Sequence, residues 1–191
     1  MISLDLFCWA LAFLGFIMKL YNLPGAEAVL VLSLGLLATT YMLAPYLNRY
    51  RNIAEKILPG IYFHTDTAQS LISIYMFGVS AALVVVGSLT KLMLWPNSKF
   101  LLSLGAGALL LFLAVSFYWR SRSAITYNRR LATRGILNLV IAVGMLLLSD
   151  SRLADMYYSH DPDYARVVKR ALLHPDDPEV RKQLEEARPK P

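Results

Sequence analysis

A short motif near the N-terminus recurs 72 residues further along the chain, and an apolar run follows it both times. A repeat of this length is one supersecondary unit, and its copies bury their apolar faces against each other. We therefore predict a duplicated hairpin of two hydrophobic helices. The matched positions are Gly15, Lys19, Pro24 and Gly35 in the first copy and Gly87, Lys91, Pro96 and Gly107 in the second.

The composition places these helices in a membrane. Of the 191 residues 57% are hydrophobic and only 17% are charged, which leaves too little polar surface for a water-soluble globule. The apolar residues gather into runs close to the roughly 20 residues that a helix needs to cross about 30 Å of hydrocarbon. The predicted fold class is all-α, a polytopic α-helical membrane protein.

In each hairpin a proline next to a glycine or an asparagine ends the first helix, and these residues allow the chain to reverse direction in a tight turn. A fifth helix has two possible placements, because its uninterrupted apolar core runs only from Gly135 to Leu148. It either spans the membrane or lies partly in the interface. The predicted divisions are a first hairpin over 1–48, a basic loop over 49–69, a second hairpin over 70–119, a basic loop over 120–134, a fifth transmembrane helix over 135–149 and a polar helical tail over 150–191.

Basic residues in the loops predict the orientation. Eight Lys and Arg residues follow the second and fourth apolar runs, against three at the opposite ends. Positive flanks stay on the cytoplasmic side, so the N-terminus and both long loops are expected in the cytoplasm and both proline turns outside. The tail is external if the fifth helix spans and cytoplasmic if it does not. The net charge of +6 belongs to these loops and does not indicate nucleic-acid binding.

The tail carries two helix-start signals. Asp161-Pro162 and Asp177-Pro178 each place a capping carboxylate before a proline at the first helical position. Short helices are therefore predicted over about 162–173 and 178–187. Neither is long enough to be stable alone, so they pack on each other, on the membrane surface or on a partner.

Lys19 and Lys91 lie inside apolar runs. A charged side chain in a membrane-spanning segment costs free energy and often has a functional role. Each lies five residues before the turn proline, so its ammonium is expected to snorkel to the headgroups and anchor the helix end. Contact with a partner or lipid, and an ion-coupled role, are the alternatives. The apolar runs hold no acidic residue at their centres, which argues against an ion path.

Small residues predict where helices approach each other, because small side chains allow close packing inside lipid. Gly35 and Gly107 are expected to mark the inner seam between the hairpins, so that Gly107→Leu would destabilise the bundle. The three histidines, among them His64, lack the companions that a metal site needs, and no catalytic motif is present. We expect no metal, no cofactor and no enzymatic activity.

The segment from Gly15 to Ala26, with Lys19 and Pro24, resembles the N-terminal transmembrane hairpin of the GldL-type gliding-motility proteins. The segment from Gly87 to Pro96 resembles it more weakly. The resemblance implies an inner-membrane relative of the proton-driven motor of type IX secretion in gliding bacteria.

The chain departs from this family in two ways. The family carries a glutamate in the second helix, and the corresponding positions here are Thr39 and Leu111. The family also has one hairpin, where this chain has two. The resemblance thus implies a shared scaffold without the residue that carries the motor's proton.

These observations predict a non-enzymatic membrane scaffold or accessory subunit of a bacterial envelope complex. Its expected partners are membrane lipid and either other envelope membrane proteins or further copies of itself. The alternative is a small transporter or permeability factor with a polar, water-accessible site between the two repeats. An ion-driven motor subunit ranks last, because Thr39 cannot titrate.

Overall fold

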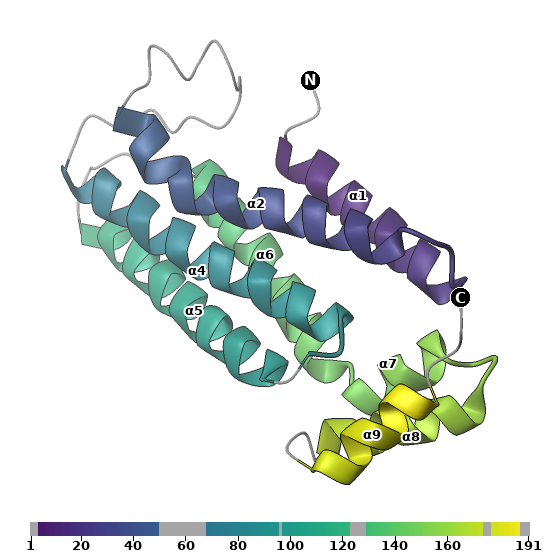
Figure 1. The fold of residues 1–191 in the computed structure, drawn as a ribbon. Helices are drawn as coiled ribbons and strands as arrows, with labels where there is room; N and C mark the ends of the chain where they lie inside the picture. The colour runs from purple at the N-terminus through teal and green to yellow at the C-terminus, as the bar shows by residue number, and fades with distance from the viewer. Residues whose placement is uncertain (1–3, 50–67, 96, 123–128, 174–176, 188–191) are drawn as a thin grey trace.

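The protein is a bundle of long helices with a smaller helical tail at one end (Figure 1). The computed structural model describes residues 4–49, 68–95, 97–122, 129–173 and 177–187, and the secondary structure in these ranges is helical. The predicted all-α fold is confirmed. The helices are α1 (Leu4–Leu20), α2 (Ala26–Arg49), α4 (Ala68–Leu92), α5 (Ser98–Arg122), α6 (Arg129–Leu147), α7 (Asp150–Tyr157), α8 (Pro162–Leu173) and α9 (Pro178–Glu186).

α4 is the central helix of the bundle. It packs against its hairpin partner α5, against α2 of the other hairpin and against α6. α1 has fewer neighbours, because it packs mainly on α2 and touches the tail through α7 (Figure 1). The buried core follows this arrangement, with Phe77 of α4 meeting Tyr41 of α2 and Phe112 of α5.

The turns of the two hairpins have the same backbone geometry at the 72-residue offset. Asn22 has a φ of 51° and its counterpart Leu94 has a φ of 54°. The amide of Leu23 donates to the carbonyl of Met18 at 2.9 Å, and the matching bond at Trp95 measures 2.8 Å. This is a Schellman motif, in which a left-handed residue lets two late amides satisfy the last carbonyls of the helix.

The next helix begins in the same way in both copies. Gly25, with a φ of 84°, is matched by Asn97, with a φ of 64°. Their carbonyls accept the first helical bonds, from Val29 at 3.1 Å and from Leu101 at 3.2 Å. Glycine and asparagine are the residues that tolerate positive φ, which explains why the short proline turns can reverse the chain here.

Among the described residues, three helices are long and apolar enough to cross a membrane, through Ala26–Leu43, Ile72–Leu92 and Ser98–Tyr118. This fits a multi-pass membrane protein. α1 has 17 residues, about 26 Å at 1.5 Å per residue, and its crossing stays a prediction. α6 qualifies only together with α7, as a pair bent by 80°, so both alternatives for the fifth helix stay open.

Two predicted boundaries were wrong. The second basic loop was expected over 120–134, but α5 continues to Arg122 and α6 begins at Arg129. Arg and Ala are good helix formers, so helical structure extends past the end of the apolar run at both sides. In the first loop, 49–69, helix reaches Arg49 and resumes at Ala68, and residues 50–67 lie outside the described residues.

The described part of the tail contains one helix more than predicted. α8 and α9 begin at the two expected prolines, and Asp161 accepts a hydrogen bond from the amide of Tyr164 at 2.9 Å. The additional α7 is capped by Ser149, whose side chain accepts from the amide of Arg152. α8 packs on both α7 and α9, so the tail helices stabilise one another as well as the bundle end.

Candidate functional site

Gly15 and Gly87 hold the two helices of each hairpin close together. A Cβ at Gly87 would lie 2.9 Å from the backbone nitrogen of Leu102, and one at Gly15 would lie 3.0 Å from Cγ of Leu30. Leu30 and Leu102 are themselves equivalent in the repeat. The motif glycine therefore fixes the approach of the following helix in both copies.

Gly35 and Gly107 do not form the predicted inner seam, and this prediction was wrong. A Cβ added to either glycine would meet no heavy atom within 4 Å. The close approach in α5 is made instead by Gly105, where a Cβ would lie 2.8 Å from the backbone nitrogen of Val84. Two positions along a helix turn a side chain through about 200°, which takes Gly107 to a different face.

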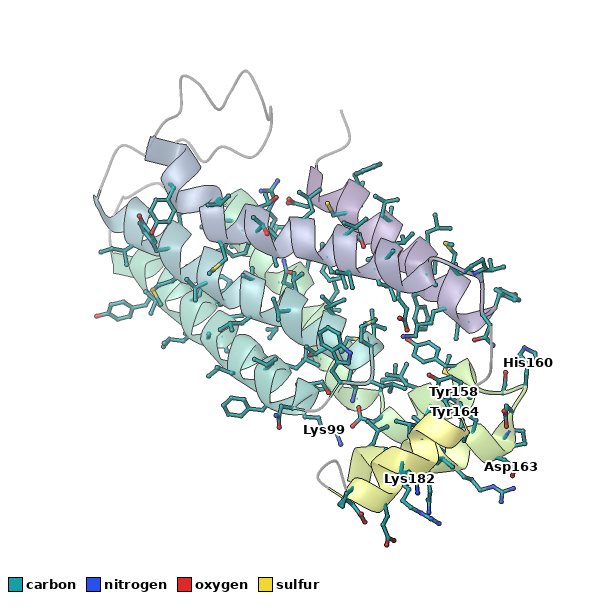
Figure 2. The ribbon with its side chains drawn as sticks, viewed as in Figure 1. Lys99, Tyr158, His160, Asp163, Tyr164 and Lys182 are labelled. Carbon is teal, nitrogen blue, oxygen red and sulfur yellow. The ribbon has the colours of Figure 1, made fainter. Side chains whose placement is uncertain are left out.

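Lys91 does not snorkel to the surface, contrary to expectation. It is 0% exposed, and its ammonium pairs with Asp150, the first residue of α7. Asp150 also pairs with Lys99 at 3.2 Å, and Figure 2 places Lys99 at the tail-facing end of the bundle. The tail supplies a counter-ion at this end, so the ammonium can stay buried rather than reach for solvent.

The carboxylate of Asp150 is stabilised in its charged form. Partial burial is the largest single influence and would raise its pKa, but the hydrogen bonds and charges of Lys91 and Lys99 outweigh it. The pKa of Asp150 is therefore held below its usual value of 3.8. We call these three residues the Asp150 cluster.

Lys19 is also buried, with 8% of its surface exposed, and so it does not snorkel as expected. Its ammonium pairs with Glu27 at 3.2 Å and lies 5.0 Å from the ring centroid of Tyr157 in α7. It also contacts the sulfur of Met93 at 3.6 Å. Both repeat lysines thus contact the tail, one through a carboxylate and the other through an aromatic face.

Three other residues that the sequence analysis singled out are a turn proline, its counterpart in the second copy and a histidine. Pro24 lies in the first turn, between Asn22 and Gly25. Pro96 and His64 lie outside the described residues.

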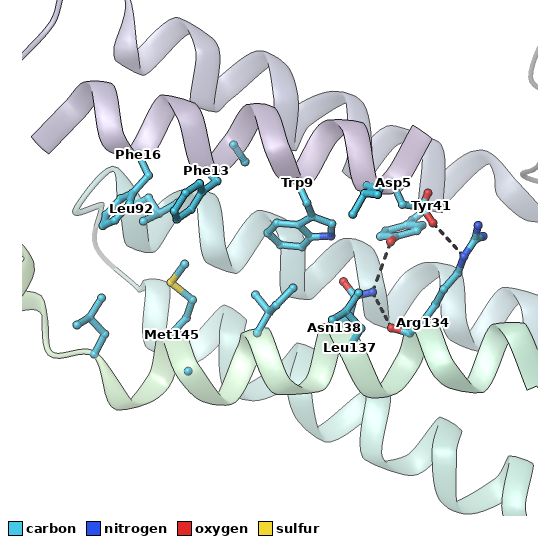
Figure 3. Close-up of a pocket in the computed structure, with 15 residues that line it drawn as sticks. Asp5, Trp9, Phe13, Phe16, Tyr41, Leu92, Arg134, Leu137, Asn138 and Met145 are labelled. Carbon is cyan, nitrogen blue, oxygen red and sulfur yellow. Dashed lines mark hydrogen bonds and ion pairs between the residues drawn. The ribbon is translucent and has the colours of Figure 1, made fainter. Parts of the chain in front are cut away.

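An open groove runs between α1 and α6 (Figure 3). It has a volume of about 700 Å³, and apolar side chains such as Phe13, Phe16 and Met145 line most of its length. It exists because α1 packs on α2 while α6 packs on α4 and α5, so the two helices flank a gap. We call this feature the α1–α6 groove.

The polar end of the groove is built by four side chains. The carboxylate of Asp5 in α1 forms an ion pair with Nε of Arg134 in α6 at 3.0 Å, which bridges the two helices. One turn along α6, the amide nitrogen of Asn138 donates to the carbonyl of Arg134 at 2.9 Å and to the hydroxyl of Tyr41 at 3.4 Å. Figure 3 shows both contacts closing one end of the groove.

Sequence reasoning missed Asp150 and the groove residues. Asp150 is visible in the sequence only as the first charge after an apolar run, and 59 residues separate it from Lys91. Asp5 and Arg134 lie far apart in the sequence, so no local pattern links them. A polar residue in an apolar run, such as Asn138, was the one available signal, and it did not reveal its neighbours.

Comparison with protein-family models, with curated proteins and with solved structures gave no match.

Proposed function

We propose that the protein is a non-enzymatic membrane scaffold or accessory subunit of a bacterial envelope complex. One observation carries the proposal, namely the dry seam between the two hairpins. Tyr41, Phe77 and Phe112 form a run of ring contacts from α2 through α4 to α5, with centroids 5.5 Å and 5.6 Å apart. A bundle closed in this way is suited to holding partners at its periphery.

The same observation argues against a transporter with its site between the repeats. Such a protein needs a polar, water-accessible cavity there. The described side chains between α2 and α4 are instead mostly apolar and in direct contact, among them Leu37, Ala81 and Val85. The large groove lies elsewhere, between α1 and α6, and it is mainly apolar.

The proposed setting is the bacterial inner membrane, with the N-terminus in the cytoplasm and the proline turns outside. The excess of basic residues after α2 and α5 supports this orientation. The motif residues shared with the GldL-type hairpin support a place in an envelope assembly. Thr39 stands where that family has its glutamate, and its hydroxyl donates to the carbonyl of Gly35 at 2.8 Å, so we assign no proton-carrying role.

The outer face of α5 is the proposed contact surface for a transmembrane helix of another envelope protein. Of the apolar segment Ser98–Tyr118 in α5, 33% is buried inside the protein, whereas 56% of the apolar segment Ile72–Leu92 in α4 is buried. Gly107 lies on this exposed surface with open space around it, and Leu111 is 59% exposed one turn later. An exposed glycine lets a second helix approach closely where lipid provides no hydrophobic driving force.

The test is photo-crosslinking in intact membranes. A photoreactive residue replaces Leu111, and in the matched control it replaces the fully buried Leu109 of the same helix. The Leu111 probe is expected to capture one envelope protein in fixed ratio, and the Leu109 probe is expected to capture none. Gly107→Leu, combined with the Leu111 probe, should abolish the capture because it fills the approach site.

Three results would count against this scaffold role. Recovery of the chain alone from the Leu111 probe would remove the evidence for a partner. Equal capture by the Leu109 probe would show that the adduct is non-specific. Unchanged capture in the Gly107→Leu background would place the interface on another face.

A further inference from the structure

The α1–α6 groove carries two buried polar atoms that nothing in the described structure satisfies. These are Nε1 of Trp9 and Oδ1 of Asn138, and neither has a hydrogen-bond partner. Asn138 is 1% exposed, and its nitrogen is already committed to Arg134 and Tyr41, which fixes its oxygen toward the remaining space. Leaving such atoms unpaired in an apolar site is costly, so an unexplained buried pair points to a ligand.

The two atoms lie at the same depth in the groove. Trp9 is four residues after Asp5 in α1, and Asn138 is four residues after Arg134 in α6. Since Asp5 and Arg134 are paired, Trp9 and Asn138 both lie one helical turn inside that ion pair. Figure 3 shows the indole and the amide extending into the groove from opposite helices.

The chemistry of this pair selects the group that would lie between them. The indole N–H is only a donor, and the amide oxygen is only an acceptor. A hydroxyl group satisfies both at once, because it accepts from Trp9 and donates to Asn138. An ester or keto oxygen satisfies Trp9 alone and leaves Asn138 unpaired.

The rest of the groove selects an aliphatic chain. From Asp5 to Phe16 it follows α1 for eleven residues, about 16 Å at 1.5 Å per residue. This matches one hydrocarbon leaflet, about 15 Å or half of the core. The volume of about 700 Å³ lies within the range of ligand pockets.

The charges at the polar end of the groove select an uncharged head group for this ligand. Arg134 is the cation at the polar end, and it already pairs with Asp5 at 3.0 Å. The mouth of the groove therefore offers no excess charge to an anionic head group. A hydroxyl-bearing, uncharged head is the chemistry that fits.

We propose that the α1–α6 groove binds a neutral amphipathic lipid, with its aliphatic chain along α1 and α6 and a hydroxyl of its head between Trp9 and Asn138. This site is independent of the contact surface on α5. It makes a lipid of the acylglycerol class a structural ligand of the bundle.

Quenching of Trp9 fluorescence by brominated lipid tests the site directly. Trp95→Phe and Trp119→Phe are introduced into the full chain so that Trp9 is the single emitter. The purified protein in detergent is titrated with a monoacylglycerol whose stearoyl chain is brominated, and separately with the methyl ester of the same acid. The glyceride should quench saturably, and the methyl ester should bind about tenfold more weakly because it cannot donate to Asn138.

Two variants separate the hydroxyl contact from the shape of the groove. Asn138→Leu should weaken glyceride binding about tenfold while leaving methyl-ester binding unchanged, which a general loss of folding would not do. Gly144→Leu should abolish binding of both probes, because Gly144 lines the groove and a Cβ added to it would meet no heavy atom within 4 Å, which leaves room for the new side chain to occupy the groove. Gly107→Leu, the same substitution on α5, should leave both affinities unchanged.

The proposal is overturned by any of three results. The two probes binding equally to the parent protein would remove the hydroxyl contact. Equal weakening of both probes in Asn138→Leu would do the same. Trp9 emission that stays unquenched at every lipid ratio would exclude lipid as the occupant and leave a second copy or a partner helix as the alternatives.

Discussion

The two hairpins share their local geometry and differ in their surroundings. Both use the same Schellman turn, and in both the motif glycine lies against an equivalent leucine. α4 of the second hairpin, however, is packed by α2, α5 and α6, whereas α1 of the first rests mainly on α2. Local backbone structure follows the repeated sequence, and burial follows what packs around each copy.

The lysines illustrate the difference most clearly. Lys91 is completely buried and pairs with Asp150, whose side chain is a quarter exposed. Lys19 pairs with Glu27, whose side chain is 67% exposed. The same residue in the same motif is therefore part of a desolvated cluster in one copy and of a half-solvated pair in the other.

The largest expected effect comes from filling the close approach in each hairpin. Gly87→Leu should lower the free energy of unfolding by about 3 kcal/mol, since a backbone nitrogen is the nearest atom. Gly15→Leu should cost about 2 kcal/mol, because the nearest atom belongs to the movable side chain of Leu30. Thermal unfolding in detergent measures both.

The matched controls are Gly35→Leu and Gly107→Leu, which place the same side chain into open space. Each should change the free energy of unfolding by less than about 0.5 kcal/mol. If all four variants melt at the same temperature, the close approaches do not limit stability and the comparison between the hairpins loses its physical basis.

The second effect concerns the ion pairs. Asp150→Ala should destabilise the protein by about 2 kcal/mol, because it leaves Lys91 buried without its counter-ion, while partial exposure of Asp150 moderates the cost. Glu27→Ala, the equivalent break in the first copy, should cost less than about 0.5 kcal/mol. Denaturant unfolding of the two variants provides the comparison.

A double-mutant cycle tests whether the pair itself is responsible. Adding Lys91→Met to Asp150→Ala should recover most of the lost stability, since an apolar side chain replaces the unpaired charge. Strict additivity of the two substitutions would contradict the assignment and locate the effect of Asp150→Ala elsewhere in α7.

The third effect concerns the left-handed residue of each turn. Leu94 adopts a φ of 54° that disfavours a bulky side chain, whereas the equivalent Asn22 suits it. Leu94→Asn should raise the free energy of unfolding by about 1 kcal/mol, and Asn22→Leu should lower it by a similar amount. If Leu94→Asn and Asn22→Leu both lower the melting temperature, side-chain packing at Leu94 outweighs its backbone strain.

The smallest expected effect is a dependence on pH. The pKa of Asp150 is lowered in the folded protein, so its contribution to stability is fully present above its usual value of 3.8 and is lost as the pH falls through the lower folded value. Hydrogen exchange in α7 should therefore speed up selectively below about pH 4. Asp150→Ala should show no such selective change.

The helices of the bundle were predictable because apolar runs of sufficient length determine them locally. The caps at Asp161 and Asp177 were equally local, and both accept the expected amide hydrogen bonds. Short α7 was missed, because eight residues with mixed polarity give a weak periodic signal. The groove escaped prediction because its two walls, α1 and α6, are far apart in the sequence.

By itself the sequence determined the helical class and the two turns, since backbone conformation depends mainly on neighbours in the chain. Tertiary structure decided that the close approaches occur at Gly15 and Gly87 and not at Gly35 and Gly107. Tertiary structure decided that Lys91 stays buried, that Gly107 faces outward and that Asn138 lies opposite Trp9 in a groove. Those outcomes depend on which helices become neighbours. Burial, charge pairing and open space are properties of the assembled bundle. The two copies of the motif therefore differ in these properties, because different helices pack against each copy.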